Sequence, residues 1–379
     1  MSSRLFLLFL AVVVYFAYQS WFSSDDEAPS AGTEGSTASP GDVPIETIEV
    51  EGEEIAEPEG EPAEPRKLTL NMGESIEAER ASVANPAAAL MQERTAARQR
   101  GDEDQVRRLN ERIRKEFPDT DAARWLQFEE GREALRRYRG LGKTTEGLQA
   151  AQEARLLLTP ALFIRNVSAR ERGELRRSLK ELAQAVLFSS RHVEGADFRY
   201  VPRRGDTLEK LCRRTFRSRG AHVAPGLVAS VNRMRSPRDL RAGESIKVPL
   251  GKTHIVVQKH EFRLYLLVGG AYVADFTVGL GRDDLTPEHE FVIDNKMRNP
   301  DWFPRPGEKI PFGDPRNILG TRWLGFKNGS DYRGFGIHGT QDPASTGRNS
   351  SSGCVRMRQA DVELVFDWTP HGTRVSIRR

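Results

Sequence analysis

Two short segments near the C-terminus concentrate the residue types that carry out nucleophilic chemistry. Cys354 lies in a loop of serines and glycine, without the large apolar neighbours that usually precede a structural cysteine. His338 lies in the other segment, GFGIHGT. A thiol with the ordinary pKa of about 8.5 is only a few per cent ionised at neutral pH, so it needs a neighbouring base. Cys354 and His338 are therefore candidates for a nucleophile and its general base and acid; spacing alone also allows two unrelated structural side chains.

The residues beside Cys354 suit acyl chemistry. Gly353 permits close approach of the backbone, and the consecutive amides of Gly353 and Cys354 can form an oxyanion pocket. Arg356 is two residues from Cys354, so in an extended chain both side chains point the same way. The guanidinium could then hold a substrate carboxylate.

The two segments belong to a stretch whose pattern predicts a mostly-β domain over residues 253–379. The sequence from His254 onward alternates as strands do, and the pair Gly269-Gly270 marks a hairpin. Strands of this domain must bring His338 close to Cys354 if the two act together.

A smaller unit precedes it, over residues 198–250, and its pattern predicts strand, helix, helix, strand. Gly205 provides the turn after the first strand, and Asp206 or Thr207 can cap the helix that follows. Cys212 lies on the apolar face of that helix, which indicates a buried core thiol. A basic insertion, RSRGAHVAPG, separates the two helices.

Residues 67–197 are predicted to be an all-α region of short helices. Apolar residues recur at helical spacing in three stretches. They are Val106, Leu109, Ile113 and Phe117, ended by Pro118; then Trp125, Phe128 and Leu135; then Leu175, Leu179, Leu182, Ala183 and Val186. The many arginines indicate a solvated face or a binding patch, and the sequence does not identify a ligand.

The N-terminus predicts a membrane anchor followed by a disordered acidic linker. Leu5–Tyr18 is unbroken apolar sequence, and extension to Phe22 gives a helix of about 27 Å, close to the thickness of a hydrocarbon core. Residues 23–66 carry 14 Asp/Glu against one Lys/Arg and few aromatic side chains. We therefore expect an uncleaved signal anchor over residues 1–22 and a tether over residues 23–66.

The composition excludes several classes of protein. A net charge of +3 over 379 residues conceals a basic body of net +15 after residue 66. Two cysteines exclude a disulfide scaffold and a cysteine-rich zinc site, and no histidine pair has metal-ligand spacing. No cofactor or metal is expected. The basic stretches lack the aromatic interleaving of nucleic-acid binding, so nucleic acid is not an expected partner.

The unit at 198–250 resembles the LysM family, which binds N-acetylglucosamine-containing glycans such as peptidoglycan. The resemblance rests on Tyr200, the GDTL run from Gly205, Asn232, Leu240, Gly243 and the IKVP ending at Ile246–Pro249. The insertion between the helices departs from the family at its glycan groove.

The segment 253–379 resembles the catalytic domain of the L,D-transpeptidases. The matching motifs are FRLYLL from Phe262, Asn299–Trp302, Leu319–Trp323, Ile337–Thr340 and, above all, Ser-x-Gly-Cys-x-Arg-Met at Ser351–Met357. There are two departures from the family: Ser352 replaces a frequent histidine, and Glu288-His289 follows Thr286-Pro287 where x-Gly is common.

This resemblance implies that Cys354 is the nucleophile, His338 the general base and acid, and Gly353 part of the oxyanion pocket. It implies substrate contacts at Arg356, Ser351, Ser352 and Gly339. The implied reaction is acyl transfer from the bond between a diamino acid and D-alanine in a peptidoglycan tetrapeptide. The acceptor would be a second diamino acid (a 3→3 cross-link) or a lysine of an envelope protein.

Two alternatives stay open at this stage. With water as acceptor the enzyme is an L,D-carboxypeptidase acting on stem peptides, and without activity the chain is a wall-binding scaffold. In every case we expect a bacterial envelope protein, exported to the periplasm or wall side and anchored in the cytoplasmic membrane. The expected partners are peptidoglycan glycan strands and stem peptides, the inner membrane and an acceptor protein.

Overall fold

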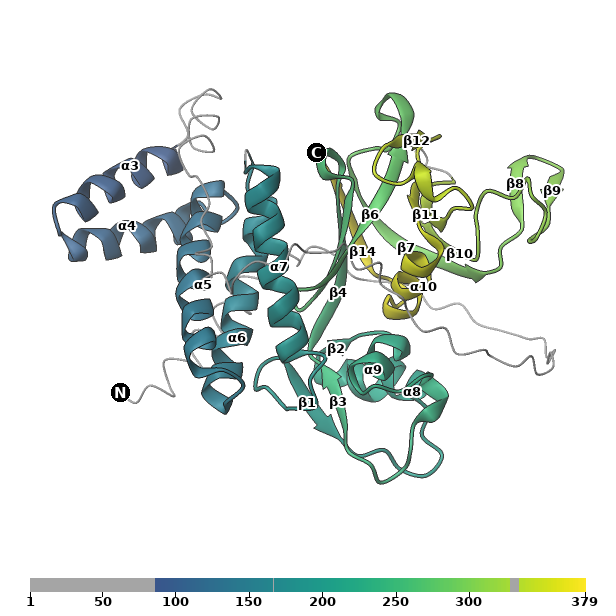
Figure 1. Cartoon of the computed structure of the whole chain (residues 1–379), viewed down its shortest axis with the longest axis horizontal. Coiled ribbons are helices and arrows are strands. Elements are labelled where there is room, and N and C mark those ends of the chain that lie inside the picture. Colours follow the sequence, from purple (N-terminus) through teal and green to yellow (C-terminus); the bar gives the residue numbers. More distant parts are fainter. Residues whose placement is uncertain (1–85, 166, 328–333) are drawn as a thin grey trace, which may run out of the picture. The chain divides into compact units, whose positions relative to one another are not determined.

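The computed structural model of the chain describes residues 86–165, 167–327 and 334–379. Helices come first, then a small mixed unit, then a β-rich region (Figure 1). The predicted membrane helix at 1–22 and linker at 23–66 lie outside the described residues. Within the described ranges, no helix is long and apolar enough to cross a bilayer.

The all-α prediction is confirmed over the described part of residues 67–197. The helices are α3 (Pro86–Gln99), α4 (Glu103–Glu116), α5 (Asp121–Leu141), α6 (Thr145–Leu158), the short 3₁₀ turn η1 (Thr159–Phe163) and α7 (Ala169–Val186). Side-chain caps start most of them: Asp102, Thr120, Thr144 and Ser168 each accept an amide hydrogen bond from the first turn. Apolar residues predicted from the helical spacing, such as Ile113, Phe128 and Leu179, are buried in one core.

The small unit has the predicted order of strand, helix, helix, strand. Strand β1 (Asp197–Tyr200) pairs antiparallel with β3 (Ile246–Pro249), and between them lie α8 (Leu208–Lys210), its π-helical continuation η2 (Leu211–Phe216) and α9 (Pro225–Val231). Thr207 caps α8, whereas Asp206 accepts the Arg203 amide instead. Cys212 is buried on η2, and burial raises the pKa of its thiol to about 12.

The basic insertion of this unit forms a strand of its own. After the 3₁₀ turn η3 (Arg217–Arg219), β2 (Ala221–His222) leaves the small unit and pairs in parallel with β4 (Gly251–Gln258) of the β-rich region. Thr253 donates its hydroxyl to the His222 carbonyl beside this pairing, at 3.0 Å. The indole nitrogen of Trp368 donates to Ser230 on α9 at 2.9 Å. The insertion thus joins the small unit to the β-rich region.

The β-rich region is built on eight strands whose pairings form a closed ring. In pairing order they are β4, β5 (Arg263–Val268), β6 (Ala271–Gly281), β13 (Val355–Met357), β11 (Gly336–Gly339), β10 (Arg322–Phe326), β7 (His289–Arg298) and β14 (Arg374–Arg378), which returns to β4. The predicted hairpin at Gly269-Gly270 joins β5 to β6, and both glycines have the positive φ that such a turn requires.

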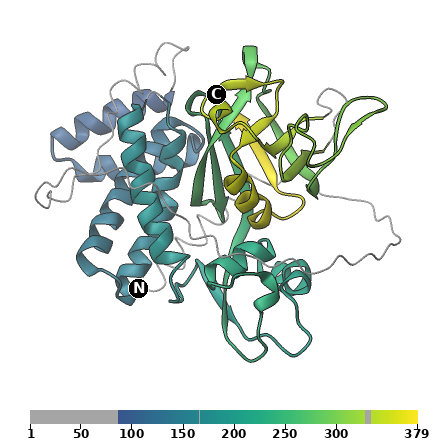
Figure 2. The same cartoon turned by 45° about the vertical axis from the view of Figure 1, so that its right-hand side comes forward.

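Three further elements complete this region. Helix α10 (Gln359–Trp368) packs on β10 and β11 (Figure 1, Figure 2). Strand β12 (Asn349–Ser351) pairs with the end of β6, and β8 (Trp302–Arg305) with β9 (Glu308–Ile310) forms a separate hairpin. The Asn317 side-chain amide donates to the carbonyls of Pro300 and Ile310, so it holds the base of that hairpin.

A buried charged cluster links α7 to strand β5. Glu261 forms ion pairs with Arg172 and with Arg176, the latter at 3.0 Å. Tyr265 on β5 donates its hydroxyl to Glu261 at 2.6 Å, and burial of this phenol raises its pKa above its usual value. Glu261 therefore accepts hydrogen bonds from Arg176 and Tyr265 on one carboxylate oxygen, and its other oxygen faces Arg172 as an ion pair.

Candidate active site

Parallel pairing of two short strands brings the candidate nucleophile loop to the candidate base. Strand β11 carries His338 and pairs in parallel with β13, so that His338 lies opposite Arg356. Cys354 immediately precedes β13. Neighbouring strands are about 4.8 Å apart, and residues opposite each other in a parallel pair share one face. The two segments separated in sequence are therefore adjacent in the fold.

The surroundings of His338 favour a neutral ring with a defined tautomer. The side chain is 2% exposed, and its Nδ1 donates to the Gly339 carbonyl at 2.6 Å, which leaves the Nε2 lone pair free to accept a proton. Burial lowers the pKa of His338 to about 4, against the opposing effect of the Gly339 hydrogen bond. The indole of Trp323 stacks on the imidazole with ring centroids 5.9 Å apart.

Cys354 is in turn favoured as a neutral thiol. Burial raises its pKa, although the Gly336 amide and the charge of Arg356 act in the opposite direction. The Sγ–H donates to the Gly334 carbonyl at 3.5 Å. Because the pKa of the thiol lies above that of the imidazole, the resting pair is a thiol and a neutral histidine. The proton must then move during attack, so a general base is required.

Ser351 holds the turn that carries the nucleophile. Its hydroxyl accepts from the Gly353 amide at 3.1 Å and donates to the Cys354 carbonyl at 2.7 Å. The Gly353 amide, which we predicted for the oxyanion pocket, is thus engaged within the turn. The Cys354 amide has no acceptor within the described part of the chain. Gly353 has φ +124°, and a Cβ there would lie 2.5 Å from the Phe335 ring, so only glycine fits.

The predicted substrate-contact residues differ in their exposure. The Arg356 guanidinium is half-buried, and its Nε has no hydrogen-bond partner in the described ranges. Ser352 is exposed at the tip of the turn. Gly339 is buried, and a Cβ there would lie 2.5 Å from the Gln359 side chain, so it can contribute only backbone. Ser351 is buried and supports the turn rather than facing solvent.

Sequence reasoning did not identify Trp323 and Gln359 as parts of the site. Trp323 lies over the His338 ring because it is the register partner of His338 on β10. The Gln359 amide accepts from Thr321 at 3.1 Å and donates to the Thr340 carbonyl at 3.2 Å, so it ties the ends of β10 and β11 together. The missing signal is strand register for Trp323 and the packing of α10 on β10 and β11 for Gln359, and no local pattern in this sequence specifies either.

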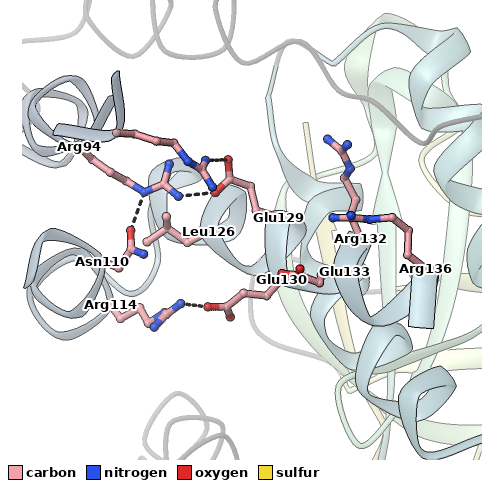
Figure 3. Close-up of a pocket in the computed structure, with 10 residues that line it drawn as sticks. Arg94, Asn110, Arg114, Leu126, Glu129, Glu130, Arg132, Glu133 and Arg136 are labelled. Carbon is pink, nitrogen blue, oxygen red and sulfur yellow. Dashed lines mark hydrogen bonds and ion pairs between the residues drawn. The ribbon is translucent and has the colours of Figure 1, made fainter. Parts of the chain in front are cut away.

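A cavity of about 370 Å³ lies among α3, α4 and α5 in the helical region, and the residues that line it are distant in sequence from Cys354 and His338. Figure 3 shows ion pairs among part of its charged side chains. Arg94 and Arg98 pair with Glu129, and Arg114 pairs with Glu130. These pairs join neighbouring helices, whereas Arg132, Glu133 and Arg136, which also line the cavity, form no ion pair within the described residues.

Comparisons with known proteins identify two regions of the chain. Residues 252–377 match the family model of the L,D-transpeptidase catalytic domain, and residues 200–249 match that of the LysM domain. YqjB of Bacillus subtilis, named as an L,D-transpeptidase, is 39% identical over 129 residues, which cover 34% of this chain and 72% of that protein. YkuD of the same organism, also so named, is 32% identical over 190 residues, covering 48% of this chain and 98% of that protein.

A relative from Escherichia coli extends the match further along this chain. YcfS, named as an L,D-transpeptidase, is 27% identical over 209 residues, covering 50% of this chain and 63% of that protein. The match to YkuD includes nearly the whole of that relative at more than 30% identity. Together with the two family models, this similarity shows that the chain is an enzyme of the L,D-transpeptidase family that also carries a LysM domain.

Proposed function

We propose that this enzyme transfers the acyl group of a peptidoglycan tetrapeptide through a thioester on Cys354. The donor bond joins the third residue, a diamino acid, to the terminal D-alanine. The acceptor is an amine, either of another diamino acid, which gives a 3→3 cross-link, or of a lysine on an envelope protein. The neutral pair formed by Cys354 and His338 carries this proposal, because it provides a nucleophile directly before β13 and a base with a free Nε2 on the adjacent strand β11.

In the proposed reaction, His338 moves one proton in each half. As Sγ attacks the carbonyl carbon, its proton passes to Nε2 of His338, and the Cys354 amide donates to the developing oxyanion. Collapse of the tetrahedral adduct breaks the C–N bond, and the imidazolium protonates the departing D-alanine amine. The acceptor amine then gives a proton to His338 as it attacks the thioester, and the proton returns to sulfur when the thiolate leaves.

Arginines near the nucleophile support a substrate that carries carboxylates. Arg356 presents a half-buried guanidinium whose Nε has no hydrogen-bond partner in the part of the chain described. Burial lowers its pKa, and the charge of exposed Arg282 acts in the same direction, whereas Cys354 and the carboxylate of Asp342 act in the opposite direction. A carboxylate of the stem peptide would relieve the first two effects. In this proposal Ser352 and the Gly339 backbone complete the contacts with the stem peptide.

The other regions are proposed to hold the enzyme at its substrate. The LysM domain implies peptidoglycan binding and a place in the cell envelope. We further propose that it tethers the enzyme to glycan strands, and that residues 1–22 anchor it in the cytoplasmic membrane with the body outside. The proposed domain limits are 1–22, 23–66, 67–197, 198–250 and 253–379.

Incubation of the protein with a disaccharide-tetrapeptide, followed by mass spectrometry of the products, tests the proposed reaction. A cross-linked dimer with loss of D-alanine is expected from the wild type and should be absent with Cys354→Ala. Tripeptide without dimer would identify a carboxypeptidase instead. Absence of D-alanine release and of a thioester adduct on Cys354 would refute the proposed chemistry.

A further inference from the structure

A buried threonine joins the loop before β7 to the backbone of the nucleophile turn. The side-chain oxygen of Thr286 accepts from the Gly281 amide at 2.7 Å and donates to the Gly353 carbonyl at 2.9 Å. The residue is 1% exposed. The hydroxyl therefore accepts from one backbone group and donates to another. The first, the Gly281 amide, lies at the end of β6, and the second, the Gly353 carbonyl, lies in the turn before β13.

The packing around this hydroxyl leaves little freedom for the turn. A Cβ built on Gly281 would lie 2.9 Å from the Gly353 Cα and 2.7 Å from the Thr286 amide nitrogen. The end of β6 and the turn before Cys354 are thus in direct backbone contact. Two glycines permit this contact, and Thr286 supplies the hydrogen bonds that fix its orientation.

Gly353 and Cys354 together have four backbone N–H and C=O groups, and side-chain hydroxyls form hydrogen bonds with three of them. Ser351 binds the Gly353 N–H and the Cys354 carbonyl, and Thr286 binds the Gly353 carbonyl. The fourth group, the Cys354 N–H, is the one without an acceptor in the described chain. A trans peptide is planar, with its carbonyl and N–H on opposite sides, so a fixed carbonyl also fixes the direction of the N–H.

We propose that Thr286 is a positioning residue for acyl transfer: by holding the Gly353 carbonyl, it directs the Cys354 amide toward the oxyanion of the substrate. This inference rests on the proposed thioester chemistry and adds a residue to it. Thr286 touches neither the sulfur nor the substrate in this role. Its contribution is specific to steps in which a carbonyl oxygen gains charge.

Two reactions of the same thiol separate this role from a general structural one. Release of D-alanine from the disaccharide-tetrapeptide requires an oxyanion, whereas alkylation of Cys354 by iodoacetamide does not. We expect Thr286→Val to lower kcat for D-alanine release about tenfold or more, with KM little changed and the alkylation rate within about twofold of wild type. Thr286→Ser keeps the hydroxyl and should retain most of the activity.

Controls fix how each outcome is interpreted. Thr373→Val removes another buried threonine hydroxyl, which donates to the Pro370 carbonyl at 2.8 Å, and should change neither rate. Rates are normalised to the Cys354 that can be alkylated, measured by peptide mapping, so unfolded protein does not contribute. A parallel fall of both rates in Thr286→Val, or no fall in either, would overturn the inference. A wild type that is alkylated but releases no D-alanine would instead refute the proposed function and, with it, this role.

Discussion

Acidification should destabilise the folded protein through His338. The buried imidazole has a pKa of about 4 in the folded protein, against about 6.5 in an unfolded chain. The unfolded chain therefore takes up a proton at a higher pH than the folded protein does. The contribution to stability is present above about pH 6.5 and is lost as the pH falls toward 4.

The size of the effect follows from the two pKa values. If only the unfolded state took up the proton, the free energy of unfolding would fall by about 3 kcal/mol. About 2 kcal/mol of this fall should occur between pH 7 and pH 5. Burial is the main cause, because the ring is 2% exposed and a charge there would lose its hydration.

Urea unfolding of the wild type and of His338→Gln, at steps between pH 7 and pH 5, measures this contribution. The substitution can shift the free energy of unfolding at every pH, but only the pH-dependent part of the difference reports the proton. We expect the difference to shrink by about 2 kcal/mol toward pH 5. His254→Gln should behave in the same sense, because burial lowers the pKa of His254 to about 3. A difference that stays constant over this range would refute the depressed pKa of His338.

Two substitutions test other features of the fold. Glu261→Gln leaves the buried Arg172 without its ionic partner and should reduce the free energy of unfolding by about 3 kcal/mol in urea titrations; a change below about 0.5 kcal/mol would mean that the cluster does not stabilise the protein. Gly353→Ala combines φ +124° with a contact at 2.5 Å to Phe335 and should abolish D-alanine release. Its control, Gly347→Ala, has φ +79°, and the new methyl group would lie 3.7 Å from the Thr277 side chain, an ordinary contact, so it should cost only about 1–2 kcal/mol of stability; comparable activity in the two variants would contradict the packing argument.

The sequence predicted the elements of this protein better than their pairing. Helical spacing located the buried faces of α4, α5 and α7, because a period near 3.6 is a property of the local sequence. The pair Gly269-Gly270 located a hairpin for a similarly local reason. The closed ring of strands could not be predicted, since β6 pairs with β13 across most of the domain and no local pattern encodes that contact.

The candidate site likewise has features that the sequence predicts and features that only the folded structure defines. Motif similarity predicts Cys354 and His338 as nucleophile and base, but it does not predict the features that determine their protonation. The low pKa of His338 depends on burial, and its tautomer depends on one backbone carbonyl, which only the folded structure defines. The use of the Gly353 amide within the turn was missed because it depends on the rotamer of Ser351. The basic insertion of the small unit gave no sign of the strand that it forms.

That strand, β2, has a consequence for how such enzymes can be divided or recombined. Its two residues cover the start of β4, where Gly251 and Lys252 would otherwise present unpaired backbone at a sheet edge. Unpaired N–H and C=O groups at a sheet edge can pair with another strand. An isolated catalytic fragment that begins near residue 252 would carry such an edge, and exchange of the glycan-binding module for another would have to supply a replacement strand. Strand β2 of the LysM domain thus covers one end of strand β4 in the catalytic domain.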